Sequence, residues 1–222
     1  MNATPDFLLK GSYYALFQCG RFVTSAMTLY NAGDHATAIG LAALAHEESG
    51  RYLYLRKQWE NVSKGQTVTV EGVRKYCENH LHKQEWGQGD TSFSDKAITK
   101  LAMDSNQALP GSEERQAAEK KLEALIEKKR KRIPHDRDNK RMQVWYVEPN
   151  ASGMDWNKPW EQDKEEAKQF IQAACNAYSK GYFKFENLEF LRASNKEFAH
   201  AIEAWTDRPT LPPRSSFIRL EF

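Results

Sequence analysis

The chain has 222 residues, which is enough for one well-buried core, and its composition does not call for a second domain. Hydrophobic residues make up 40% and charged residues 28%, which is typical of globular proteins and excludes the disordered and collagen-like classes. Its 32 Lys and Arg and 30 Asp and Glu residues give a net charge of +2. No global field would therefore hold nucleic acid or an anionic membrane, and any affinity for RNA must come from a local patch.

The cysteines and the first residues indicate the compartment. Cys19, Cys77 and Cys175 are far apart, odd in number and without C-x-x-C spacing, so we expect neither a disulfide framework nor a zinc site. The chain does not open on a basic region followed by an apolar stretch, and no window approaches the ~18 apolar residues of a membrane span. We expect a cytoplasmic protein that has no membrane segment.

The first sixty residues predict a helical hairpin. From Phe7 to Tyr30 apolar residues recur at steps of three and four, which is the period of a helix. Asn31 to Gly33 is a stop signal, and Asp34 is suited to cap the next helix. The segment from His35 to Trp59 continues the helical pattern with many small residues that allow close approach. A short turn between two long helices makes them antiparallel neighbours.

The middle of the chain predicts shorter helices and one extended segment. A third helix is expected from Thr69 to about Trp86, and a weaker fourth from Ser94 to Ala108. Ser112 opens a fifth helix, which is highly charged and ends in the basic run Lys128 to Arg141. The alternating, aromatic-rich sequence from Met142 to Val147 favours a short extended segment.

The last third of the chain predicts two more helices and a tail. Pro149 to Trp160 is expected to be a loop, and Lys164 to Tyr178 is an amphipathic helix. Leu188 to Trp205 predicts another helix. The Pro-rich tail from Arg208 to Phe222 is expected to be extended and packed on the surface or on a partner.

Four features, in the order in which they occur, resemble a known family. The string AIGLAALAHEESGRYLYL, from Ala38 to Leu55, is similar to the second-helix signature of the abortive-infection AbiV family, a bacterial phage-defence group of the HEPN superfamily. A His-Lys pair at His82 and Lys83, the sequence VWYV, and a late helix from Glu165 to Tyr178 follow in the family's order. The resemblance covers most of the chain up to Tyr178.

The chain departs from the family pattern at two places. Arg51 stands where the family usually has Lys, and the region from Arg192 to Phe222 has no counterpart. The resemblance implies an all-α, HEPN-like helical bundle built on a long antiparallel helix hairpin, with one short extended segment. We expect a single domain over residues 1–222, with a core at about 6–180 and a C-terminal helix and tail at 181–222. The resemblance also implies a homodimer, with the apolar first hairpin at the interface.

The resemblance further implies a chemistry. HEPN ribonucleases carry an R-x(4–6)-H motif, in which His acts as acid and base on the 2′-hydroxyl and Arg stabilises charge on the phosphorane, without metal or other cofactor. Arg74 and His80 have that spacing, and imidazole and guanidinium suit those tasks. On one ideal helix the two lie about 120° apart, so they converge only if the helix ends between them or a partner subunit completes the site.

Three other residues compete for a role in this site. His82 matches the family's His-Lys position and lies about 80° from Arg74, although either His could simply occupy a solvated face. Glu47 and Glu48 lie in an apolar stretch, where an unpaired carboxylate is costly to bury. Glu47 could pair with Arg51 four residues on, or one of the two could orient Arg74 or a His. His46 and Glu47 lack the second His of a zincin motif, so no metal site is expected.

The basic run is the second candidate site. Its residues could track an RNA backbone, or they could lie there because cations favour a helix C-terminus. The candidate RNA-binding residues are Lys128, Lys129, Arg130, Lys131 and Arg132.

We therefore expect a phage-defence protein of HEPN type that acts as a metal-independent endoribonuclease. The alternative keeps the fold without the chemistry: a non-catalytic interaction protein that senses a phage product and arrests growth by binding it.

Overall fold

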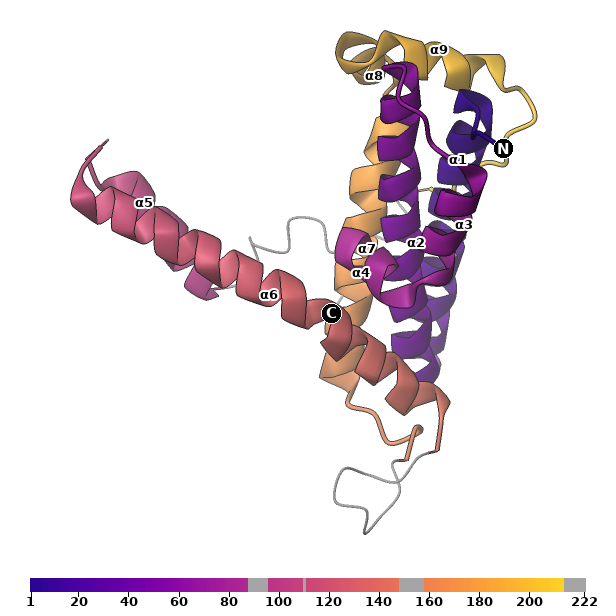
Figure 1. The fold of residues 1–222 in the computed structure, drawn as a ribbon. Helices are drawn as coiled ribbons and strands as arrows, with labels where there is room; N and C mark the ends of the chain where they lie inside the picture. Colours follow the sequence, from indigo (N-terminus) through magenta and orange to yellow (C-terminus); the bar gives the residue numbers. More distant parts are fainter. Residues whose placement is uncertain (88–95, 110, 148–157, 214–222) are drawn as a thin grey trace.

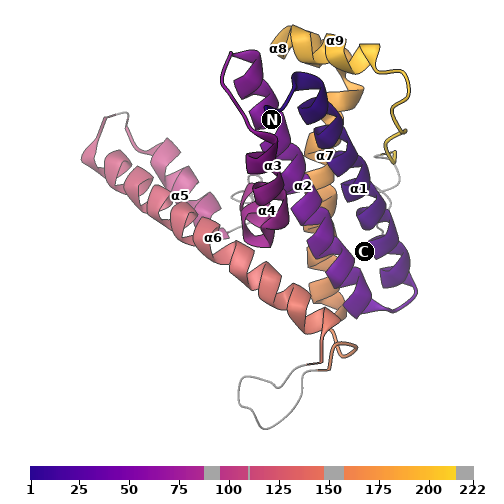
Figure 2. The ribbon, with the colours of Figure 1, turned by 45° about the vertical axis from the view of Figure 1, so that its right-hand side comes forward.

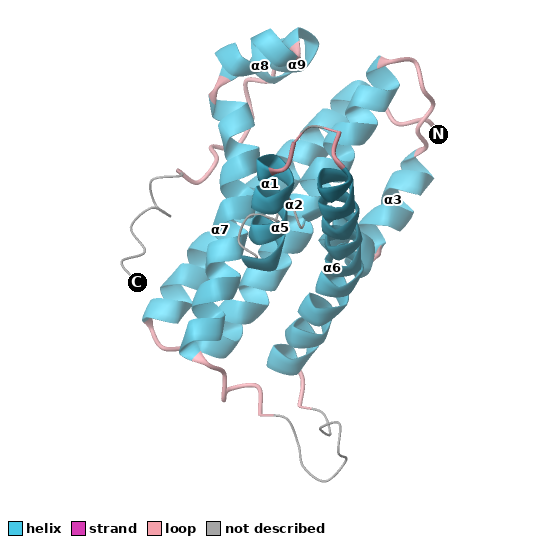
Figure 3. Cartoon of the chain, turned by 90° about the vertical axis from the view of Figure 1, so that its left-hand side faces the viewer, coloured by secondary structure: helices cyan, strands magenta, loops and turns pink. Residues whose placement is uncertain are grey.

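The computed structural model describes residues 1–87, 96–109, 111–147 and 158–213, and these fold into α-helices joined by turns (Figures 1 and 3). Figure 3 shows no strand in these ranges, and the extended contact found there is an isolated bridge between Asn2 and Thr69. The all-α prediction is confirmed. The helices are α1 (Pro5–Asn31), α2 (His35–Ser63), α3 (Val70–Glu78), α4 (His80–Gly87), α5 (Lys96–Gln107), α6 (Glu113–Trp145), α7 (Lys164–Glu186), α8 (Leu188–Ser194) and α9 (Lys196–Ala204).

Helices α1 and α2 form the antiparallel hairpin that the sequence predicts (Figure 1). The side chain of Thr4 accepts a hydrogen bond from the Phe7 N–H and begins α1, with Pro5 at the position where a missing N–H costs nothing. Gly33 has a φ of +85°, the left-handed conformation that reverses the chain after α1. Asp34 then accepts from the Thr37 N–H at 3.0 Å and caps α2, as expected.

The core lies where α7 packs along this hairpin and α9 closes one end (Figures 1 and 2). Small residues allow close approach: a Cβ on Gly20 would lie 2.7 Å from the ring of Tyr178, and one on Gly181 would lie 2.6 Å from Leu16. The largest apolar side chains that are fully buried in this core are Leu8, Leu9, Leu16, Tyr52, Ile171, Tyr178, Leu191, Phe198 and Ile202.

The prediction of a single helix from Thr69 to Trp86 is wrong, because the structure has two helices that are separated at Asn79. Asn79 has an extended backbone, and its side chain accepts from the His82 N–H at 3.1 Å. An asparagine side chain competes well with helix-internal bonds and caps the helix that follows. The chain therefore turns at Asn79, and α4 packs against α2 without continuing the direction of α3.

The extended segment predicted from Met142 to Val147 is also wrong over most of its length. Helix α6 continues through Pro134 and ends only at Trp145, and Tyr146 is the first extended residue. Val144 packs on Ile39 of α2, and this burial overrides the local preference of an alternating sequence. The N-terminal half of α6 pairs with α5 and leaves the bundle, while the C-terminal half lies against α2 and α4 (Figures 1 and 2).

The C-terminal region differs from the expected single helix. Asn195 accepts from the Phe198 N–H and begins α9 separately from α8. Residues 208–213 of the tail belong to no helix and are held by two tyrosines: Tyr13 donates to the Pro209 carbonyl and Tyr178 to the Pro212 carbonyl. The rest of the tail, most of the loop predicted before α7, and the start of the helix predicted at Ser94 lie outside the described residues.

In the described part of the chain, no helix combines the length and the apolarity that crossing a bilayer requires.

Close packing at Gly20 generates a test of the core. Alanine is favoured over glycine inside a helix by about 1 kcal/mol, but overpacking a filled core costs roughly 1–3 kcal/mol. Because the Tyr178 ring cannot easily move, we expect the cost to exceed the gain, so that Gly20→Ala lowers the free energy of unfolding by up to about 2 kcal/mol in urea titrations. Gly11→Ala is the control, since its Cβ would meet only the flexible end of Leu55, at 3.2 Å, and should be close to neutral. Equal stability of both variants would contradict the tight packing.

Candidate functional site

The centre of the candidate site is the carboxylate of Glu47, in the middle of α2. Its side chain is only 3% exposed. Oε2 lies 2.7 Å from His80 Nδ1 and 3.2 Å from Lys83 Nζ. Oε1 accepts from Gln84 Nε2 at 3.4 Å and lies 3.5 Å from Arg141 Nε. A buried carboxylate needs such partners, and here two other helices supply them.

Helix α4 supplies three of the four partners because of its spacing. His80, Lys83 and Gln84 are separated by three and four residues, so they share one face of the helix. The break at Asn79 turns that face toward α2, and the Asn79 cap holds the first turn in place. The Lys83 side chain is only 5% exposed, so its ammonium is committed to Glu47.

Helix α6 supplies the fourth partner. Arg141 is held by Asp138 one turn earlier, which accepts from Nη2 at 2.7 Å and from Nε at 3.1 Å. The two carboxylates of Glu47 and Asp138 thus meet the two cations of Arg141 and Lys83, and His80 is the titratable member at the edge. We name these five residues together with Gln84 the Glu47 cluster.

His80 is the member of this cluster that can meet a ligand. Its side chain is 49% exposed, while Nδ1 is bonded to Glu47. When the neutral ring donates from Nδ1 to a carboxylate, Nε2 keeps its lone pair and can accept a proton. A carboxylate that orients an imidazole in this way is a recurring arrangement in general acid and base catalysis.

The structure does not bring Arg74 to this cluster. The helix does end between Arg74 and His80, but the guanidinium of Arg74 turns to Glu71 at 3.0 Å and to Glu78 at 3.7 Å. The Arg74 side chain is 64% exposed, and ion pairs at such positions are weak. His82 also lies apart from the carboxylate. Its ring stacks on Tyr76 with centroids 6.1 Å apart.

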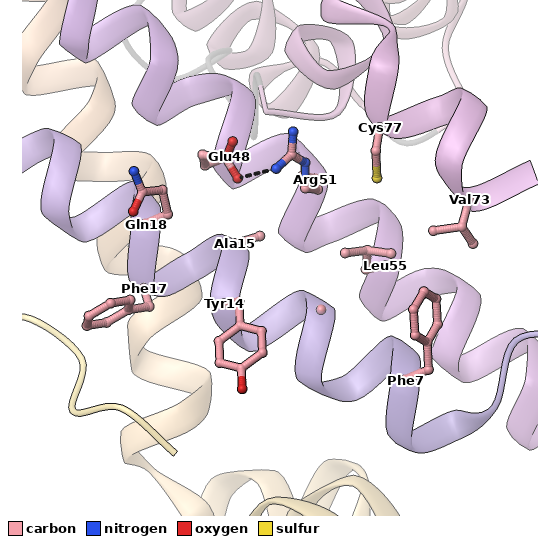
Figure 4. A pocket seen from close by; sticks show the side chains of 11 residues that line it. Phe7, Tyr14, Ala15, Phe17, Gln18, Glu48, Arg51, Leu55, Val73 and Cys77 are labelled. Carbon is pink, nitrogen blue, oxygen red and sulfur yellow. Dashed lines mark hydrogen bonds and ion pairs between the residues drawn. The ribbon is translucent and has the colours of Figure 1, made fainter. Parts of the chain in front are cut away.

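Glu48 has a different environment from Glu47. It pairs with Arg51 at 3.0 Å, whereas Glu47 contacts His80, so of the two alternatives for Glu47 the structure has the contact with a His and not the pair with Arg51. The reason is that Glu47 is turned to α4 and α6. Glu48 and Arg51 line a pocket of about 560 Å³ between α1, α2 and α3, with Phe7 and Tyr14 of α1 at its edge (Figure 4). Burial raises the pKa of the Glu48 carboxyl, and the charge of Arg51 opposes that shift.

The basic run, Lys128 to Arg141, lies in the C-terminal half of α6. Lys128 is exposed, and Arg132 is exposed and paired with Asp136 at 2.9 Å. The side chains of Lys129, Arg130 and Lys131 lie outside the described residues.

Sequence reasoning missed Gln84, Asp138 and Arg141. Gln84 could have been found from its spacing of four residues after His80, once His80 was a candidate. Arg141 was counted in the basic run, and nothing local distinguishes it from its neighbours. Its approach to Glu47 depends on how α6 packs across α2.

The raised pKa of Glu48 predicts a pH dependence of stability. A carboxyl whose pKa is higher in the folded chain contributes stability at pH below its unfolded pKa and loses it as the pH rises through the folded pKa. We therefore expect Glu48→Gln, which cannot ionise, to unfold at higher urea concentration than the parent at pH 7, with the difference shrinking as the solution is acidified. Glu165→Gln, at an exposed position, is the control. A variant that is less stable than the parent at pH 7 would show that the Arg51 pair outweighs desolvation.

Comparison with known families connects this arrangement to a function. The HEPN_AbiV family model, described as AbiV, matches residues 7–179, which covers most of α1, all of α2 to α6 and most of α7. No curated protein and no solved structure gave a match. The match spans well over half of the chain, so the chain belongs to the AbiV family of the HEPN superfamily, which places it among the HEPN-type proteins of abortive-infection phage defence.

Proposed function

We propose that this protein acts in abortive infection as a metal-independent endoribonuclease, with His80 as its acid and base and Glu47 as the group that positions His80. The observation that carries the proposal is the 2.7 Å contact between buried Glu47 and half-exposed His80. The ring is fixed on one side and open on the other. That is what a proton-transferring group needs if it is to reach a ligand from solvent.

The proposed reaction uses the ribose itself as the nucleophile. Nε2 of His80 takes the proton of a 2′-hydroxyl, whose oxygen attacks the adjacent phosphorus. The bond from phosphorus to the 5′-oxygen breaks, and that oxygen takes a proton from Nε2 of the His80 imidazolium, which returns to the neutral ring. The products are a 2′,3′-cyclic phosphate and a 5′-hydroxyl. Glu47 stabilises the imidazolium that forms in between.

Lys83 and Arg141 act in this proposal as positioning residues. Both are committed to buried carboxylates, so they compensate charge around Glu47 and do not reach the substrate. A cation that meets the phosphorane must come from elsewhere. Arg74 takes that part only if its weak pairs with Glu71 and Glu78 open, or if it is supplied by a partner subunit.

The second candidate function is the non-catalytic interaction protein, and one observation favours it. Glu47 and Lys83 are almost completely buried, and their charges balance within the fold. A buried ion-pair network can fix how helices pack without doing any chemistry. In that case the cluster holds α4 on α2, and the protein arrests growth by binding a phage product.

A cleavage assay distinguishes the two functions. General acid and base catalysis contributes roughly 10²–10⁴-fold, so His80→Ala should reduce RNA cleavage by at least about 100-fold, in EDTA as well as without it. Glu47→Gln should also reduce the rate and shift the pH profile, since it removes the charge that stabilises the imidazolium. Cleavage is followed on labelled RNA, and circular dichroism checks that each variant folds.

The matched control is His82→Ala. His82 lies on the same short helix but does not contact Glu47, so its removal should leave most of the activity. Loss of activity in His82→Ala with His80→Ala unaffected would reverse the assignment. A parent protein that cleaves no RNA, with phage protection kept in all variants, would favour the binding function.

We also propose a homodimer through the exposed aromatic edge of α1. Phe7 and Tyr14 are large, exposed and adjacent to the pocket between α1 and α3 (Figure 4). Aromatic residues that fill a partner's pocket contribute most to interface affinity. A second copy that presents the same edge would cover both pockets.

The oligomeric state tests this interface. Placing a charge at its centre with Tyr14→Lys should weaken dimerisation at least about tenfold, measured by sedimentation equilibrium. Met103→Lys adds the same charge at an exposed apolar position of α5 and should leave the dimer unchanged. A parent chain that sediments as a monomer, or a Tyr14→Lys variant that dimerises normally, rules the interface out.

A further inference from the structure

Arg137, in the C-terminal half of α6, is a buried cation to which the described part of the chain brings no counter-charge. It is only 9% exposed, and its Nη1 atom is buried with no hydrogen-bond partner. No ion pair within the described residues includes it. The two aspartates beside it in the sequence are already engaged, because Asp136 pairs with Arg132 and Asp138 with Arg141.

Such a group calls for an explanation because buried charges in proteins are nearly always paired. Burial lowers the pKa of Arg137 to about 10, so the guanidinium still carries its proton at neutral pH. The described residues therefore enclose most of this positively charged group and supply no anion to it. An anion from solution would supply what is missing.

The surroundings of Arg137 form a pocket of suitable size. It has a volume of about 400 Å³ and is lined by residues from the C-terminal half of α6 and the beginning of α7, which the ion pair of Lys140 with Glu166 joins. Pockets for small ligands begin at roughly 300 Å³. The pocket is lined by Asp136, Arg137, Asn139, Lys140 and Gln143 of α6 and by Glu166 and Phe170 of α7.

The charges of this lining leave Arg137 unbalanced. Lys140 pairs with Glu166 across the two helices at 2.6 Å, and Asp136 is neutralised by Arg132. Both carboxylates are thereby compensated. Arg137 is the remaining net charge in the pocket, and its planar fork matches an oxyanion in two-point contact.

We propose that this pocket binds a small phosphorylated ligand of nucleotide size, with Arg137 holding the phosphate group. Phosphate fits better than a carboxylate because Asn139 and Lys140 bring further donors for its additional oxygens. The half-buried ring of Phe170 offers an apolar face on which a base can lie. The site shares no residue with the Glu47 cluster, and the proposal does not depend on RNA cleavage.

Binding to the full chain at constant ionic strength tests the proposal. Calorimetric titrations with inorganic phosphate, AMP and a short single-stranded RNA identify the source of the phosphate. Arg137→Met should weaken AMP binding at least about tenfold, as expected for loss of a charged hydrogen bond. Lys120→Met removes one positive charge from an exposed position of α6 that does not line the pocket, and it should change AMP binding less than about twofold. Phe170→Leu should weaken AMP but not inorganic phosphate.

Melting temperatures supply an independent readout. Without ligand, Arg137→Met should melt no lower than the parent, because it removes an uncompensated buried charge. Phosphate or AMP should raise the melting temperature of the parent and not that of the variant. Binding of RNA alone, lost in Arg137→Met, would support the phosphate site with the nucleic-acid backbone as its source. A parent that binds none of the three, or an Arg137→Met variant that binds them equally well, overturns the proposal whatever the outcome of the cleavage assay.

Discussion

The buried carboxylate of Glu47 sets the geometry around it. A charge at that depth is tolerated only with partners close by, and those partners come from two helices that are far from α2 in sequence. Neither α4 nor α6 can shift along α2 without separating Glu47 from Lys83 or Arg141. The same requirement holds His80 at the edge of the cluster, half in solvent, with one ring nitrogen fixed. An interaction needed for packing is therefore also what orients the group best placed for chemistry.

The hairpin and the site differ in how much of them the sequence predicts. The period of three and four from Phe7 onward, the glycine at Gly33 and the cap at Asp34 are local signals, and α1 and α2 follow them closely. The break at Asn79 is local too, but an asparagine within a helical pattern also occurs in unbroken helices, so the pattern alone gave one helix where there are two. The contacts of Asn79 decide between these outcomes.

The remaining differences arise from packing between distant elements. An alternating stretch such as Met142 to Trp145 prefers an extended backbone when considered by itself, but Val144 is buried against α2 and the helix persists. Glu47 and Glu48 are adjacent and chemically identical, and a single sequence does not reveal which of them turns to α4. Their roles differ only because α2 has α4 and α6 on one side and the pocket between α1 and α3 on the other.

The arginines of α6 illustrate the same limit. In the sequence, Arg132, Arg137 and Arg141 belong to one basic run, and a run of that kind is usually interpreted as a solvated face or a contact for nucleic acid. In the fold, Arg132 is exposed and paired, Arg141 is drawn into the Glu47 cluster, and Arg137 is buried with no carboxylate. The helix leaves the bundle at one end and lies against it at the other, so position along its axis determines the dielectric around each guanidinium. Of these three guanidinium groups, Arg137 has no ion-pair partner among the described residues, so it has the most to gain from an external anion.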